Sequence, residues 1–209
     1  MTRPINHAII VSHPSEDSFT LAIARRYLSE IEGLGQTGFI RDLYRTGFDP
    51  LLREPERHGE PGSDVEAEWD LLDSADIVVL VYPIWFGGPP AMLKGYVERV
   101  FGAGRQAGQA QDGAASSRLA GKHLVSLQLS GSMRTWLHEK GVMNSLRNLF
   151  ERYLSEVFGL PETHSYHFDG ITQGMSEKDA AYHLSSAGEA ARTILAEVRA
   201  EWQKDPRRG

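Results

Sequence analysis

Apolar residues along the chain follow two patterns, short continuous runs and longer stretches in which they recur every three or four positions. A continuous run predicts a strand buried on both faces, and the longer period predicts an amphipathic helix. The apolar runs predict strands at His7–Ser12, Ile77–Val81 and His123–Leu129, and two more polar segments, Thr37–Leu43 and His164–Phe168, are also expected to be strands. The helical period predicts helices at Asp17–Glu32, Asp64–Leu72, Pro90–Phe101, Gly141–Phe158 and Ser176–Gln203. Because strands and helices alternate, we expect an α/β three-layer sandwich around a five-stranded parallel sheet.

Two predicted helices have long apolar faces that we expect in the core. The face on the 141–158 helix comprises Leu146, Leu149, Phe150, Tyr153, Leu154, Val157 and Phe158. The face on the 176–203 helix comprises Ala187, Ala191, Ile194, Leu195, Val198 and Trp202. The stretches Thr46–Ser63 and Gly102–Ser117 lack either period, which indicates two long loops, the second of them mobile. Residues 204–209 are expected to be a frayed tail.

Composition narrows the class of protein. The 209 residues are enough for one domain, which we place at residues 1–209. A net charge of −6 argues against a nucleic-acid partner, and no segment approaches the roughly 18 apolar residues of a membrane span. The absence of cysteine excludes disulfides and thiolate catalysis. We therefore expect a cytoplasmic protein without membrane insertion.

The segment Tyr82–Phe101 carries the clearest functional signal. It follows the buried run Ile77–Val81, passes through the turn-forming residues Gly87-Gly88-Pro89-Pro90, and continues into a helix. In parallel sheets, ligands bind at the carboxyl ends of the strands. An exposed Trp85-Phe86 pair at that edge offers a flat apolar surface, which suits a planar heteroaromatic ligand.

A second candidate site follows the first strand, at Ser12–Thr20. Hydroxyl groups here, together with the free N–H groups that begin a helix, form an anion site. The alternative is that Asp17 or Ser18 only caps the helix. Both segments follow parallel strands, so they lie on one edge of the sheet, where one could hold the phosphate of a nucleotide and the other its ring.

Three blocks of sequence resemble the flavodoxin-like NAD(P)H:quinone oxidoreductase family, which includes DT-diaphorase and bacterial quinone reductases. The blocks are His13-Pro14 with Ser18-Phe19, Asp42-Leu43-Tyr44 followed by Gly47-Phe48-Asp49-Pro50, and Tyr82–Phe101. The resemblance implies a flavodoxin-like fold, a bound flavin (FAD or FMN) and NAD(P)H as co-substrate. It also implies a homodimer and a ping-pong reaction that passes hydride through flavin N5 to a quinone or similar flat electrophile.

The resemblance also implies which residues contact the flavin. Around its phosphate and ribityl chain it places His13, Ser18, Phe19 and Thr20. Along the isoalloxazine ring it places Pro83, Ile84, Trp85 and Phe86, and in a third loop Ser130, Gly131 and Ser132. It assigns no catalytic side chain, because the hydride passes through the flavin.

The chain departs from the family at four places. Thr20 stands where asparagine is usual, and the third loop reads Gln128-Leu129-Ser130-Gly131-Ser132-Met133 rather than Thr-Thr-Gly-Gly. After the predicted 90–101 helix, Gly102-Ala103-Gly104-Arg105 replaces a Gly-Phe-Ala-Tyr segment. The family's Tyr and His for proton handling are not matched either. Thr20 and the third loop alter expected contacts to the flavin. The aromatics of the replaced Gly-Phe-Ala-Tyr segment help to form the family's substrate pocket, so substrate preference does not transfer.

Other functions remain to be weighed. An ancillary regulatory flavoprotein subunit of a cation-efflux transporter, with little turnover, is the alternative. The eight histidines are scattered, no HExxH motif occurs, and we expect no metal site. No Gly-x-Ser-x-Gly motif supports a hydrolase. Lys94 and Glu98 are expected to form a solvated pair, and Phe150 and Tyr153 to lie in the core.

Overall fold

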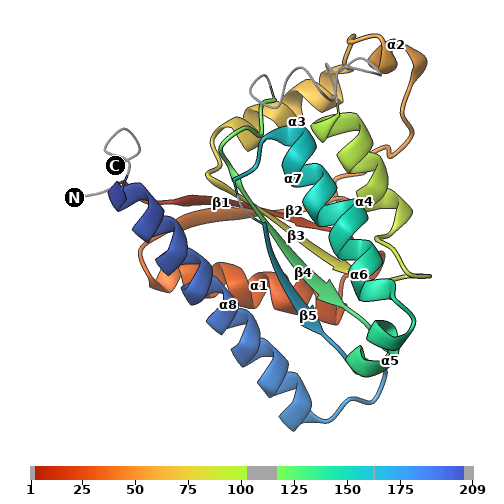
Figure 1. Cartoon of the computed structure of the whole chain (residues 1–209), viewed down its shortest axis with the longest axis vertical. Helices are drawn as coiled ribbons and strands as arrows, with labels where there is room; N and C mark the ends of the chain where they lie inside the picture. The colour runs from red at the N-terminus through yellow and green to blue at the C-terminus, as the bar shows by residue number, and fades with distance from the viewer. Residues whose placement is uncertain (1–2, 103–116, 162, 205–209) are drawn as a thin grey trace.

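A parallel sheet forms the centre of the protein, whose computed structural model describes residues 3–102, 117–161 and 163–204 (Figure 1). Within these ranges the five strands run in the order β2-β1-β3-β4-β5. Their bounds are β1 Asn6–Val11, β2 Thr37–Asp42, β3 Ile77–Pro83, β4 His123–Leu129 and β5 Thr163–Phe168. The predicted parallel sheet is confirmed, and each predicted strand agrees with an observed one to within two residues at either end.

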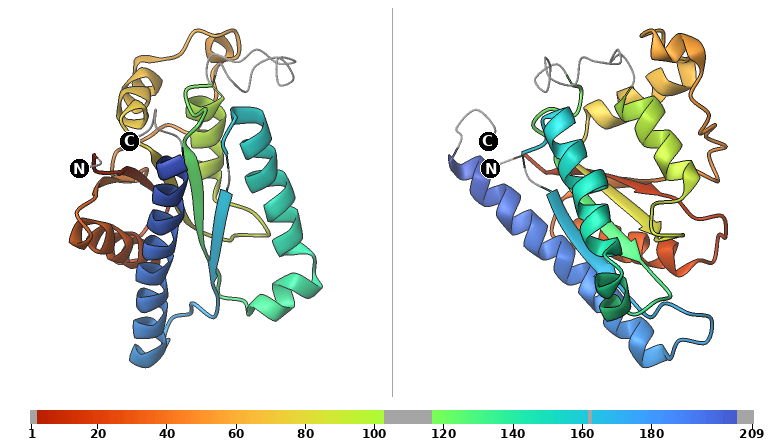
Figure 2. Two further views of the ribbon diagram at one scale, coloured as in Figure 1. Left: turned by 60° about the vertical axis from the view of Figure 1, so that its left-hand side comes forward. Right: turned by 45° about the vertical axis from the view of Figure 1, so that its right-hand side comes forward.

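Helices cover both faces of the sheet (Figure 2). One face carries α1 (Phe19–Gly33) and α8 (Glu177–Lys204). The other carries α3 (Ser63–Asp73), α4 (Ala91–Tyr96) with its π-helical continuation η1 (Val97–Phe101), and α7 (Tyr153–Phe158). Shorter helices are α2 (Glu54–Arg57), α5 (Arg134–Glu139), α6 (Val142–Leu146) and the π-helical η4 (Arg147–Arg152). This arrangement is the predicted three-layer sandwich.

Alternating side chains of the central strands supply two separate cores, because successive residues of a strand point to opposite faces. Ile9, Val79 and Val125 pair across the sheet and pack with α1 and α8. Ile10 and Leu80, one residue later in each strand, pack beneath α3, α4 and α7. All six predicted core residues of α8 are buried, which confirms the predicted apolar face.

The long helix predicted at Gly141–Phe158 is present over residues 142–158, but its predicted apolar face is wrong in part. The segment comprises α6, η4 and α7, and Leu149 and Tyr153 are 74% and 55% exposed. The buried side chains Leu146, Phe150, Leu154 and Phe158 are four residues apart. In a regular helix such a series drifts around the axis, and the wider π turn offsets the drift. The parallel stripe that contains Leu149 and Tyr153 therefore faces outward.

The predicted loop Thr46–Ser63 is ordered by a buried ion-pair network. Arg99 in η1 donates from Nε to both carboxylate oxygens of Glu56 at 3.0 Å. Its guanidinium also donates to Asp64 at 2.7 Å and to the main-chain oxygen of Asp49. The Arg99 guanidinium lowers the pKa of both carboxyl groups. The loop contains the short helix α2, which the sequence patterns did not predict. Residues 103–116, where the mobile loop was predicted, and 205–209 of the predicted tail lie outside the described residues.

Candidate functional site

A cleft of about 580 Å³ opens at the carboxyl edge of the sheet. The chain runs from β1 outward to β2 and then back across β1 to β3, so the strand order reverses between β1 and β3. Such switch points leave a crevice that binds ligands. The cleft is lined by His13, Asp17, Ser18, Phe19, Thr20, Pro83, Ile84, Trp85, Leu129, Ser130, Gly131, Ile171, Thr172 and Gln173. Nine of the eleven residues expected around a flavin are among these.

The loop after β1 presents the start of α1 to the cleft. Ser18 is the N-cap, and its Oγ accepts a hydrogen bond from the Leu21 N–H at 3.2 Å. Its hydroxyl proton stays available to a ligand, as do the first N–H groups of the helix, which have no intrahelical acceptor. The capping role and the anion site, which were posed as alternatives, are therefore compatible. An anion at this position also gains from the helix dipole.

His13 joins this loop to the aromatic loop after β3. The Nδ1 of its ring accepts a hydrogen bond from the Ser15 N–H at 3.1 Å and lies 3.4 Å from the Ser15 main-chain oxygen. Its ring centroid lies 5.9 Å from that of Trp85. Burial lowers the pKa of His13, so the neutral ring is favoured.

The turn after β2, which belongs to the Asp42–Pro50 block, is hydrogen-bonded to the loop after β1. The Asp42 carboxylate accepts the main-chain N–H groups of Tyr44 at 3.1 Å and Arg45 at 3.3 Å. The Arg45 guanidinium then donates to the main-chain oxygen of Pro14 at 2.9 Å. The turn after β2 thus fixes the path of the loop after β1, which explains why both blocks belong to one site.

The aromatic loop after β3 is a tight hairpin. Trp85 and Gly88 exchange two main-chain hydrogen bonds of 2.9 and 3.0 Å, with Phe86 and Gly87 at the tip. Both tip residues have positive φ, 50° and 83°, which Gly87 adopts freely and Phe86 does not. The turn directs the Phe86 ring into solvent, fully exposed and outside the cleft. The N–H groups of Ile84 and Trp85 already donate within the protein.

The loop after β4 is held from within. Ser130 is buried, and its main-chain N–H donates to Phe168 at 2.9 Å while its main-chain oxygen accepts from Ile171. Ser130 and Gly131 line the cleft, whereas Ser132 does not. The structure therefore leaves Phe86 and Ser132 outside the cleft that gathers the other nine predicted residues.

A fourth wall was missed from the sequence. Ile171, Thr172 and Gln173 come from the connection between β5 and α8, and Ile171 bonds the loop after β4. The available signal was position alone, since this segment follows the carboxyl end of a parallel strand as the other three loops do. Asp17 and Leu129 also line the cleft without having been singled out.

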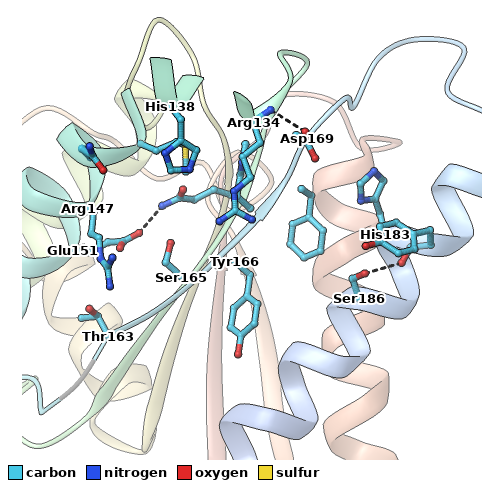
Figure 3. Close-up of a pocket in the computed structure, with 16 residues that line it drawn as sticks. Arg134, His138, Arg147, Glu151, Thr163, Ser165, Tyr166, Asp169, His183 and Ser186 are labelled. Atoms are coloured by element: carbon cyan, nitrogen blue, oxygen red, sulfur yellow. Dashed lines mark hydrogen bonds between the residues drawn. The ribbon is translucent and has the colours of Figure 1, made fainter. Parts of the chain in front are cut away.

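A separate polar groove of about 460 Å³ runs beside β5 (Figure 3). Arg134, His138 and Arg147 line it from the α5–η4 segment, opposite the strand. On its floor the Gln128 amide donates to Glu151 at 2.5 Å, and burial raises the pKa of that carboxyl. Across the described ranges no three His, Asp or Glu side chains gather so as to hold a metal ion. Among the helices that the structure describes, none is long and apolar enough to cross a membrane.

The strand order β2-β1-β3-β4-β5 and the cleft at the switch point define the flavodoxin-like class of α/β proteins. A family model described as "Flavodoxin-like fold" matches residues 6–195. The chain is 37% identical over 161 residues to an uncharacterized NAD(P)H oxidoreductase of Haemophilus influenzae, a match covering 75% of this chain and 79% of that protein. The chain therefore belongs to the flavodoxin-like NAD(P)H oxidoreductase family, which confirms the family and enzyme class that the sequence predicted.

More distant proteins have related names or the same fold. The chain is 29% identical over 117 residues to NAD(P)H dehydrogenase [quinone] 1 of Rattus norvegicus, covering 46% of this chain and 43% of that one. An NAD(P)H:quinone oxidoreductase from Methanothermobacter marburgensis has the same fold, with a TM-score of 0.80, 22% identity and coverage of 92% and 98%. An FMN-dependent NADH-azoreductase from Bacillus anthracis, solved in complex with FMN, gives a TM-score of 0.61 at 17% identity, covering 91% and 99%.

Proposed function

We propose that the protein is a flavin-dependent NAD(P)H:quinone oxidoreductase whose flavin binds in the cleft at the β1–β3 switch point. The observation that carries the proposal is the pairing, in one cleft, of an open helix N-terminus at Ser18 with the flat apolar surface of Trp85. The first suits a phosphate and the second a planar ring, and a flavin nucleotide combines both. The names of the relatives support the choice of reaction.

A flavin bound in this cleft would supply hydride transfer from NAD(P)H to the acceptor, in a ping-pong reaction. The chain's own residues bind and orient. Ser18 and the first turn of α1 hold the phosphate, while Pro83, Ile84 and Trp85 support the ring. The N–H of Gly131, which donates to no described residue, is a free donor beside the cleft. Donors at such a position stabilise negative charge that develops on a reduced ring.

We further propose that the protein acts as a cytoplasmic homodimer. The exposed Phe86 ring at the hairpin tip supports the dimer, since a partner subunit would cover a side chain that the described part of the chain leaves fully exposed. Ser132 and Phe86, which the single chain leaves outside the cleft, are then contacts to be tested on the dimer.

The test begins with the purified protein. We expect a yellow protein, or an apo-protein that binds FMN or FAD, and release of the bound flavin followed by chromatography identifies which. Trp85→Ala should weaken flavin binding by at least tenfold, because it removes the ring's support. Trp136→Ala is the matched control, since Trp136 is half exposed and lies outside the cleft. A protein that takes up neither flavin contradicts the proposal.

Turnover is measured separately, as quinone-dependent oxidation of NADH and of NADPH. Oxidation that depends on the acceptor supports the enzyme, and the faster nucleotide identifies the co-substrate. A protein that binds flavin tightly yet shows no turnover across a panel of quinones would contradict the proposed reaction.

A further inference from the structure

Strand β5 holds the loop after β4 at several points. Ser130 donates its main-chain N–H to Phe168 at 2.9 Å, and Ile171 donates back to Ser130 at 2.9 Å. Beyond the strand, the Asp169 carboxylate accepts the Arg134 N–H at 2.8 Å (Figure 3). The position of the loop beside the cleft is therefore set by Phe168 of the edge strand β5 and by the connection that follows it.

A further contact, between Ser130 and His167, joins two side chains. The Ser130 Oγ lies 2.7 Å from the main-chain oxygen of Ser132 and 2.8 Å from Nε2 of His167. A hydroxyl has one proton, and two oxygens at 2.7 Å repel each other unless a proton lies between them. The Ser130 proton must therefore point to Ser132, and His167 must supply the proton of the other contact from Nε2.

The second nitrogen of His167 has a different environment. Nδ1 is buried and has no hydrogen-bond partner within the described part of the chain. The ring lines the polar groove, where the charged or titratable groups that act on it are Asp169, just after β5, and Arg134 and His138 of α5. Burial lowers the pKa of His167. A proton added to the neutral ring would go to Nδ1, so the bond from Nε2 to Ser130 survives in either charge state.

We propose that His167 is a positioning residue for the cofactor loop. Its Nε2–H group holds the Ser130 hydroxyl on the Ser132 carbonyl, and this closes a small turn around Gly131. Gly131 lines the cleft, and its N–H donates to no described residue. His167 connects the two cavities, because it lines the groove while its hydrogen-bond partner Ser130 lines the cleft. The effect on the flavin rests on the proposed function; the tautomer and the turn do not.

The first experiment needs no cofactor. Long-range ¹H–¹⁵N correlation spectra of the apo-protein distinguish the two neutral tautomers of each histidine. We expect His167 as the Nε2–H form, assigned by the loss of its signals in His167→Gln. In Ser130→Ala the Nε2 and Hε signals of His167 should shift. An Nδ1–H tautomer for His167 would overturn the proposal whether or not the protein binds flavin.

The second experiment measures flavin affinity and the flavin reduction potential. His167→Leu removes the donor, and we expect about tenfold weaker flavin binding and a lower potential. His167→Gln places an amide N–H near the Nε2 position and should keep affinity within about threefold of wild type. His164→Leu is the matched control, because His164 lies on the same strand but contacts Glu197 of α8.

Two outcomes separate positioning from a general loss of stability. Affinity and potential that return in His167→Gln support positioning, and so does a double variant with Ser130→Ala that is no worse than either single variant. Equal losses in His167→Gln and His167→Leu, or wild-type affinity in His167→Leu, would overturn it. If the wild type itself takes up no flavin, the proposed function fails, and the tautomer measurement alone decides the positioning role.

Discussion

His7 is the clearest single residue whose charge the fold suppresses. It is fully buried in β1, its Nδ1 lies 3.1 Å from the Tyr27 hydroxyl, and its Nε2 has no partner among the described residues. Burial lowers the pKa of His7 from 6.5 to about 4, and the attraction of Asp76 offsets only part of this. The folded protein therefore holds this ring neutral at a pH where the unfolded chain would protonate it.

The first prediction is a loss of stability in acid. Between pH 6.5 and about 4 the unfolded state binds more protons at His7 than the folded state, so the free energy of unfolding falls as the pH falls. The difference between the two pKa values corresponds to about 3 kcal/mol in the free energy of unfolding. This stability is fully present above pH 6.5 and is lost as the pH falls towards 4. Urea denaturation of wild type and His7→Asn at several pH values measures it.

The control for this prediction is His58→Asn, because His58 is exposed. Protonation of the acidic groups paired with arginine also destabilises the protein in acid. The test is therefore the difference between variant and wild type in how the free energy of unfolding depends on pH. The curve of His7→Asn should be flatter than that of the wild type, while that of His58→Asn should run parallel to it. Parallel curves for all three proteins would contradict the prediction.

For single residues, the sequence predicted which ones lie near the cleft better than it predicted where their side chains point. Ser18 and Trp85 could be predicted because a cap and a loop at a strand's carboxyl end have local signatures. The direction of Phe86 could not, since it depends on the positive φ that the Trp85–Gly88 pair imposes. The role of Ser130 as an internal link depends on His167, which is distant in sequence.

Among the elements, the close contact between α4 and the loop after β2 requires a glycine, Gly95, because any larger residue would clash. A Cβ at Gly95 would lie 2.2 Å from the main-chain oxygen of Pro50 and 2.5 Å from its Cβ. The two sequence blocks of the resemblance that contain these residues therefore meet directly. Lys94 next to it behaves as predicted, since it pairs with Glu98 and both side chains are about half exposed.

The second prediction is that Gly95→Ala displaces this loop. Overpacking against main-chain atoms should destabilise the protein by about 1–3 kcal/mol, measured by urea denaturation. Gly33→Ala is the matched control: a Cβ there meets nothing within 4 Å, and alanine favours the helix. Its stability should stay equal or rise slightly. Equal stabilities for wild type and Gly95→Ala would show that the loop yields without cost.

The elements as a set were predictable because burial on both faces and amphipathic periodicity are physical requirements of this sandwich. The irregular π-helical turns inside the helices were not predictable. The π-helical segments η1 and η4 carry ordinary apolar patterns, which do not distinguish a wider turn from a regular α-helical one. The prediction of Tyr153 as a core residue was wrong for that reason, whereas Phe150 is buried as predicted.

At the scale of the whole molecule, the outward stripe on η4 and α7 stands out. Leu149 and Tyr153 lie four residues apart and are both more than half exposed, on the face of the sheet opposite α1 and α8. Exposed apolar side chains that adjoin one another mark association surfaces more often than isolated ones. We therefore assign this stripe to the interface of the proposed homodimer.

The third prediction follows from that assignment. Wild-type protein at micromolar concentration should show twice the chain mass of 23.2 kDa in size-exclusion chromatography with light scattering. Leu149→Glu and Tyr153→Glu should each shift the mass towards the monomer, since a carboxylate buried at an interface without a partner is strongly unfavourable. Leu34→Glu is the matched control: Leu34 is 39% exposed but lies at the end of α1, on the other face of the sheet. A monomeric wild type would contradict the dimer, and intact dimers of both variants would move its interface elsewhere.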